Sequence, residues 1–156
     1  MTKIFIDGSA GTTGLRIYER LESRKDIELI RLSEELRKDI NARKSAINSA
    51  DIAFLCLPDS AAVEAVSLAE NDNTVIIDTS TAHRTNPEWA YGFPELSRDM
   101  EQKIADSKRI AVPGCHASGF ISLVFPLIKA GILDKDALLT CFSVTGYSGG
   151  GKKMIA

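Results

Sequence analysis

The segment Lys3-Ile-Phe-Ile-Asp7, followed directly by Gly8-Ser-Ala-Gly11-Thr-Thr-Gly14, is the clearest indication of architecture in this chain. The mainly apolar residues 3–7 predict a buried strand, and residues 12–24 predict a helix. Between them, Gly8 permits a tight turn and Gly14 permits close packing of the helix on the strand. This segment therefore predicts the first strand–loop–helix unit of an α/β fold.

The same strand-then-helix order continues along the chain. Further strands are predicted at residues 27–32, 53–57, 74–78, 109–112 and 138–145, and further helices at residues 61–70, 97–105 and 116–129. We expect Asp59 or Ser60 to cap the second helix, and Pro126 to kink or end the last one. The early strands are near-continuous apolar runs, as in a parallel sheet that is covered on both faces. We predict the α/β class and a Rossmann-like, doubly wound parallel sheet.

The pattern changes after residue 112. The strand predicted at 138–145 is followed by few residues that could pair with it, and one strand needs partners to be stable. We therefore expect a cofactor-binding domain over residues 1–113 and, over residues 114–156, the incomplete start of an α+β substrate and dimerisation domain.

Composition narrows the functional classes. Of the 156 residues, 44% are hydrophobic and 26% charged, and the formal net charge is −2, so a nucleic acid partner is not expected. No apolar run approaches the ~18 residues of a membrane span, and no secretory signal is expected before the first strand. The three cysteines are widely spaced, which indicates neither a disulfide framework nor a metal site. We expect a cytoplasmic protein that acts on a small molecule.

The glycine loop predicts a dinucleotide site. Its spacing departs from the commoner Gly-x-Gly-x-x-Gly, and Ala10 stands near the place of the second glycine. An acidic residue at the end of the second strand would favour NAD, but Leu32-Ser33 stands there, with Arg37 and Lys38 nearby, so NADP is preferred. Alternatively, Arg37 and Lys38 lie on a solvated helix face. The residues expected to bind the cofactor are Gly8, Ala10, Gly11, Thr12, Thr13, Gly14, Ser33, Arg37, Leu57 and Pro58.

A second motif, Val112-Pro-Gly-Cys115, places a thiol where the helix at 116–129 should begin. Unpaired backbone N–H groups and the positive end of the helix dipole favour a thiolate there, and a thiolate is a nucleophile. We predict that Cys115 is catalytic and that backbone amides beside it hold an oxyanion. We expect Cys56 and Cys141 to pack as small apolar groups, and His116 to pack or face solvent.

Six motifs in this order resemble the N-acetyl-gamma-glutamyl-phosphate reductase family, in particular its shorter bacterial branch. They are Gly8-Ser-Ala-Gly-Thr-Thr-Gly14, Leu55-Cys-Leu-Pro-Asp59, Asp78-Thr-Ser-Thr-Ala-His-Arg84, Trp89-Ala-Tyr-Gly-Phe-Pro-Glu95, Val112-Pro-Gly-Cys-His-Ala-Ser118 and Ser148-Gly-Gly-Gly-Lys152. The related aspartate-semialdehyde dehydrogenases typically place Asn before the nucleophile, where this chain has Gly114. The chain departs from the family at His116, where Tyr is frequent, and at Val112, where the longer branch has Asn.

The resemblance implies an NADPH-dependent reduction of N-acetyl-glutamyl 5-phosphate to the semialdehyde, with phosphate release through a Cys115 thioester, in arginine biosynthesis. It implies a homo-oligomer and a substrate or phosphate site at Ser80, Arg84, Ser148, Gly149 and Lys152. Alternatively, Arg84 is an ordinary exposed arginine, residues 148–152 are a polar tail, and Asp78, Tyr91 and Glu95 shape the loop around the site.

The family's acid/base histidine lies in its later half, and neither His83 nor His116 stands in the matching motif. Three hypotheses therefore remain beside a structural domain that binds nothing. The chain is the N-terminal part of an active reductase, an NADP-binding module without turnover, or part of another acyl-phosphate semialdehyde dehydrogenase such as aspartate-semialdehyde dehydrogenase.

Overall fold

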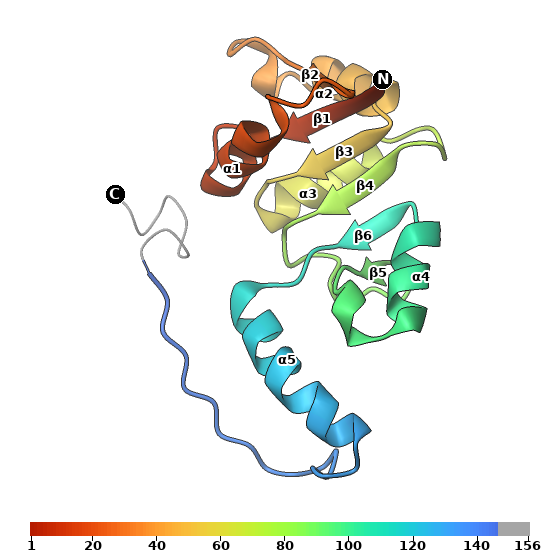
Figure 1. Cartoon of the computed structure of the whole chain (residues 1–156). Coiled ribbons are helices and arrows are strands. Elements are labelled where there is room, and N and C mark those ends of the chain that lie inside the picture. The colour runs from red at the N-terminus through yellow and green to blue at the C-terminus, as the bar shows by residue number, and fades with distance from the viewer. Residues whose placement is uncertain (147–156) are drawn as a thin grey trace.

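The computed structural model describes residues 1–146, which form a parallel sheet with helices on both faces and one long helix beyond it (Figure 1). The strands are β1 (Thr2–Asp7), β2 (Ile27–Ile30), β3 (Ile52–Leu55), β4 (Val75–Asp78), β5 (Ala90–Tyr91) and β6 (Arg109–Ala111). The α-helices are α1 (Thr12–Leu21), α2 (Ile40–Ser49), α3 (Asp59–Ser67), α4 (Arg98–Asp106) and α5 (Cys115–Lys129), with short 3-10 helices η1 (Leu36–Lys38) and η2 (Pro94–Leu96).

The six strands lie in the order β2-β1-β3-β4-β6-β5, and every neighbouring pair is parallel. The chain passes from β1 to one side for β2 and then crosses to the other side for β3. The order therefore reverses beside β1, and the carboxyl ends of β1 and β3 lie next to each other there. The predicted doubly wound sheet is confirmed, and this edge is where α/β folds bind ligands.

Alternate residues of β1 serve two separate cores. Phe5 faces the side covered by α2 and α3, where Ile47, Leu55, Ala65 and Ile76 are buried. Ile4 and Ile6 face the other side, where Ile17, Tyr18 and Leu21 of α1 pack against them. Strands buried on both faces account for the continuous apolar runs in the sequence.

Two elements, α2 and β5, are not predicted by the hydrophobic pattern of the sequence. Helix α2 carries the buried Arg43 on its inner face, which breaks the apolar stripe that normally marks a helix. Its start is marked by Asp39, whose carboxylate accepts a hydrogen bond from the Ala42 amide at 2.8 Å. Strand β5 is only two residues long, too short for any alternation to show.

Two local expectations are wrong, and one of the two outcomes expected at Pro126 does not occur. Residues 138–145 form no strand in the described part of the chain, because no neighbouring segment there supplies ladder hydrogen bonds. Asp59 and Ser60 do not cap α3: Pro58 occupies the N-cap position, and the Asp59 carboxylate bonds to Thr81 instead. Pro126 does not end α5, which continues to Lys129.

Helix α5 leaves the carboxyl edge of the sheet and extends away from it (Figure 1). Its apolar side chains remain largely in solvent, and Leu123 is 73% exposed. Within residues 1–146, no helix combines the length and apolarity that crossing a bilayer would demand.

Candidate functional site

The loop after β1 has the geometry that the glycine pattern predicts. Gly8 has φ +84°, and a Cβ there would lie 2.2 Å from the carbonyl oxygen of Cys56. A Cβ on Gly14 would lie 2.4 Å from the Gly8 carbonyl oxygen. The loop closes through a 2.9 Å hydrogen bond from the Gly11 amide to the same oxygen. Glycine is therefore required here to fit β1, the end of β3 and α1 together.

Helix α1 begins beside this loop with its first amides directed at the carboxyl edge. Gly11 is its N-cap residue, and no side chain among the described residues caps it. Thr12 and Thr13 follow with exposed side chains. Free amides and hydroxyls at a helix N-terminus form an anion-binding surface, which suits a pyrophosphate.

A cleft of about 490 Å³ opens between this loop and the end of β2. Of the predicted cofactor residues, four line it: Gly8, Ala10, Arg37 and Leu57. The other six, Gly11, Thr12, Thr13, Gly14, Ser33 and Pro58, do not line it; all but Ser33 lie at the first turn of α1 or the N-cap of α3. Its size and mixed apolar and cationic lining fit a nucleotide.

Arg31 is a cleft residue that sequence reasoning missed. The prediction extended the second strand to residue 32, whereas β2 ends at Ile30, so Arg31 is the first residue beyond it. Its guanidinium carbon lies 4.9 Å from the centre of the Tyr18 ring, a cation–π arrangement. With Arg37, it places two cations where the cleft borders β2.

An ion cluster that is buried at Asp7 and Arg43 and exposed at Glu64 lies beneath the glycine loop. Arg43 of α2 donates from Nε to Asp7 at 3.0 Å and from Nη1 to Glu64 of α3 at 2.7 Å. Asp7 is the last residue of β1, and burial raises the pKa of its carboxyl above the ordinary value, although the Arg43 guanidinium opposes this shift. One guanidinium thus ties together β1, α2 and α3.

Cys115 is the first residue of α5, and its side chain is exposed. Gly114 is the N-cap residue, so the first amides of α5 adjoin the thiol. Cys56 differs, because burial raises the pKa of its thiol to about 11. Cys141 was expected to pack, but it is exposed because the strand predicted to contain it does not form.

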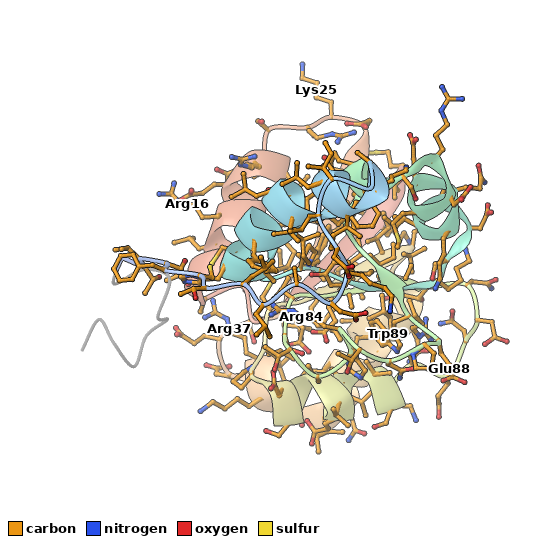
Figure 2. The ribbon with its side chains drawn as sticks, turned by 90° about the horizontal axis from the view of Figure 1, so that it is seen from below. Arg16, Lys25, Arg37, Arg84, Glu88 and Trp89 are labelled. Atoms are coloured by element: carbon orange, nitrogen blue, oxygen red, sulfur yellow. The ribbon has the colours of Figure 1, made fainter. Side chains whose placement is uncertain are left out.

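Arg84 reaches from the loop after β4 to the start of α5. Its Nε donates to the Val112 carbonyl at 2.9 Å and its Nη2 to the Thr79 carbonyl at 3.0 Å. A Cβ added to Gly114 would lie 2.8 Å from Nη1, so glycine leaves the space that the guanidinium fills. Arg84 is half-buried, unlike Arg16 and Lys25, which extend outward (Figure 2). The structure thus brings the predicted Arg84 against Gly114, the residue that precedes the predicted Cys115.

The loop between β4 and Arg84, residues 79–84, is held by a buried carboxylate. Asp78 is fully buried and accepts hydrogen bonds from the Ser80 hydroxyl and from His83 Nδ1, both at 2.7 Å. The His83 ring stacks on Trp89 with centroids 4.1 Å apart. Ser80 was predicted to contact substrate; its hydroxyl is buried and engaged with Asp78, and its role as a ligand stays a prediction.

Three other predicted phosphate ligands, Ser148, Gly149 and Lys152, lie outside the described residues. Among residues 1–146, no group of three His, Cys, Asp or Glu side chains is placed to hold a metal ion.

The chain is similar in sequence to known proteins. The family model "semialdehyde dehydrogenase, NAD binding domain" matches residues 3–104. The chain is 55% identical over 153 residues to an N-acetyl-gamma-glutamyl-phosphate reductase of Chelativorans sp., covering 98% of this chain and 49% of that protein. It is 52% identical over 153 residues to the reductase of the same name from Trichormus variabilis, covering 98% of this chain and 48% of that protein. It therefore spans about half the length of the curated relatives it matches.

Solved structures agree on the fold. An aspartate semialdehyde dehydrogenase II from Vibrio cholerae has a TM-score of 0.63 at 15% identity, covering 99% of this chain and 49% of that one. The aspartate semialdehyde dehydrogenase from Francisella tularensis has a TM-score of 0.60 at 18% identity, covering 84% and 42%. With the glycine loop, the parallel sheet and the family match over residues 3–104 in agreement, this chain belongs to the semialdehyde dehydrogenase family and carries its NAD-binding domain.

Proposed function

We propose that a protein containing this chain reduces N-acetyl-glutamyl 5-phosphate to the semialdehyde with NADPH, releasing phosphate, as a step of arginine biosynthesis. The observation that carries the proposal is the position of Cys115: it starts α5, follows the Gly114 over which the Arg84 guanidinium lies, and stands on the sheet edge where the glycine loop lies. The names of the relatives at 52–55% identity support this substrate. Because those relatives are about twice as long, the activity is proposed for the whole protein.

Cys115 is the nucleophile in this proposal. Its thiolate attacks the acyl carbon and forms a C–S bond, while the bond from that carbon to the phosphate oxygen breaks and phosphate leaves with the electron pair. The amides at the start of α5 face the developing oxyanion, and the guanidinium of Arg84 pairs with the leaving phosphate. The product of this half-reaction is a thioester on Cys115.

NADPH, when bound, supplies the hydride that reduces the thioester and frees the thiolate. The residues present fit this cofactor. The glycine loop and the start of α1 would hold the pyrophosphate, and Arg31 and Arg37 would hold the 2′-phosphate. We infer NADP in preference to NAD because two cations line the cleft where it borders β2.

We further propose that the domain boundary falls at residues 113–114, so that Cys115 opens the second domain. A homo-oligomeric whole protein and a cytoplasmic location remain part of the proposal. The three cysteines, none of which is paired within the described residues, are consistent with a reducing compartment.

The direct test measures NADPH oxidation by the full-length protein with N-acetyl-glutamyl phosphate as substrate. We expect turnover that requires Cys115 and is abolished by Cys115→Ser. In parallel, mass spectrometry of the 156-residue chain mixed with the acyl phosphate alone should detect a thioester on Cys115. Turnover with aspartyl phosphate instead would assign the aspartate-semialdehyde activity. NADPH binding without any turnover or thioester would favour the binding-module hypothesis.

A further inference from the structure

His83 has no place in the chemistry above, yet its side chain is buried and held by two contacts. It is 8% exposed, it bonds through Nδ1 to the fully buried Asp78, and its ring stacks on Trp89 with an interplanar angle of 13°. A carboxylate only accepts hydrogen bonds, so Nδ1 carries the proton and donates. Two contacts of different chemistry therefore fix one imidazole.

Because His83 directly precedes Arg84, holding the His83 side chain also restricts where the Arg84 side chain can lie. The next residue is Arg84, whose guanidinium must reach the Val112 carbonyl, 28 residues further along the chain, while Nη1 lies over Gly114. Two guanidinium nitrogens, Nε and Nη2, donate hydrogen bonds to backbone carbonyls. No hydrogen bond of Nη1 is found within residues 1–146, so this nitrogen can donate to an anion beside Cys115.

We propose that His83 is a positioning residue: through its bond to Asp78 and its stack on Trp89, it holds residues 79–84 in the conformation that keeps the Arg84 guanidinium beside Cys115. The inference rests on the proposed function only in taking Arg84 as the group that meets the anionic part of the substrate. Trp89 belongs to the buried core next to β6, so His83 ties this loop to the body of the domain.

The test compares two alkylating reagents at Cys115. Iodoacetate is an anion and iodoacetamide is neutral, so the ratio of their rate constants reports the positive charge near the thiol and is independent of its thiolate fraction and its exposure. The background carries Cys141→Ser. Arg84→Ala sets the scale: we expect the ratio to fall about threefold, as for one unit charge in water-like surroundings. Lys25→Ala, a cation that extends into solvent, should leave the ratio unchanged.

His83→Phe keeps an aromatic ring for Trp89 and removes the Nδ1 donor, and we expect it to lower the ratio at least half as far as Arg84→Ala. His83→Asn restores a donor near the position of Nδ1 and should return the ratio toward that of the unsubstituted chain. Thermal unfolding of each variant separates this local effect from loss of the fold. His83→Leu serves as a second variant without the donor.

A ratio that falls with Arg84→Ala but not with His83→Phe or His83→Leu would overturn the proposal. So would an unchanged ratio with Arg84→Ala, or the failure of both His83 variants to fold, since His83 would then support the whole domain and not one loop. Alkylation needs neither cofactor nor acyl phosphate, so a missing reductase activity would leave this result standing.

Discussion

Single residues set the limits of the cleft proposed to bind the cofactor. Gly8 adopts a left-handed backbone conformation while its Cα faces the Cys56 carbonyl, so any side chain meets both torsional strain and a backbone atom. Arg31 owes its place to the early end of β2 and to the Tyr18 ring beneath it.

Gly8→Ala should lower the free energy of unfolding by more than about 2 kcal/mol and weaken NADPH binding, because the backbone must move to accommodate the methyl group. Gly119→Ala is the matched control. Gly119 lies inside α5, nothing lies within 4 Å of an added Cβ, and the same substitution should be neutral or stabilise by up to about 1 kcal/mol. Urea denaturation measures the free energy of unfolding of both variants. Equal decreases for Gly8→Ala and Gly119→Ala would contradict the prediction.

Arg31→Ala should weaken NADPH binding about tenfold while leaving NADH binding nearly unchanged, since a charge-assisted contact to a phosphate is lost. Calorimetry on the 156-residue chain gives both affinities. Arg16→Ala removes an exposed arginine that pairs with Glu19 at 3.2 Å and should change neither affinity. An equal decrease in affinity for NADPH and NADH would show that Arg31 does not bind the 2′-phosphate.

Cys56 should resist alkylation at pH 8, where a thiol with a pKa of about 11 is thiolate in about one molecule in a thousand. Cys115 and Cys141 are exposed and should react first. Peptide mapping after timed exposure to iodoacetamide measures the order. Modification of Cys56 at the same rate as the other two would show that burial does not protect it.

At the scale of elements, side chains that bridge helices, strands and loops hold the site together. Arg43 joins β1, α2 and α3 beneath the glycine loop, and Asp59 of α3 accepts hydrogen bonds from the Thr81 amide at 2.9 Å and from its hydroxyl at 2.5 Å. The first bridge supports the glycine loop and the proposed cofactor cleft, and the second supports the loop that carries Arg84.

Arg43→Ala should cost about 3–5 kcal/mol, because it leaves the buried Asp7 carboxylate without its cation. Lys44→Ala is the neighbouring control: Lys44 pairs with Glu70 at 2.6 Å on the surface, and its loss should cost no more than about 1 kcal/mol. Chemical denaturation gives the free energy of unfolding of the two variants. Similar decreases for both would mean that the buried Arg43 ion pairs stabilise the fold no more than a surface ion pair does.

The Asp59–Thr81 bridge predicts a pH dependence. The Thr81 hydroxyl and amide lower the pKa of Asp59 below its ordinary value of 3.8. A lowered folded-state pKa gives stability that is present above pH 3.8 and is lost as the pH falls through the lower value. The melting temperature of Asp59→Ala should therefore lie below that of the unsubstituted chain at pH 7, with the gap narrowing below pH 4. Asp72→Ala, at an exposed carboxylate, should show no such gap.

For the whole molecule, the repeating strand-and-helix pattern was enough to predict the doubly wound sheet apart from the two-residue strand β5, because parallel strands buried on both faces have continuous apolar sequences. The glycine loop and the position of Cys115 followed from local rules of turns and helix starts. The rest depends on tertiary contacts. Helix α2 was not predicted because the buried Arg43 interrupts the apolar stripe on its inner face. Residues 138–145 have an apolar sequence, but no described strand pairs with them. No local pattern tells that Arg84 reaches Val112 or that His83 stacks on Trp89.

One residue, Val112, connects the segment that leads to Cys115 with β4 and with Arg84 through its main-chain atoms. Its N–H donates to the Asp78 carbonyl at 2.8 Å and its carbonyl accepts from Arg84. The position of the Arg84 guanidinium relative to the start of α5 thus depends on main-chain atoms of residue 112, of which only the N–H is missing in proline. Replacing Val112 by another residue that has a main-chain N–H should therefore keep both bonds. Proline at position 112 would remove the N–H and with it the hydrogen bond to Asp78.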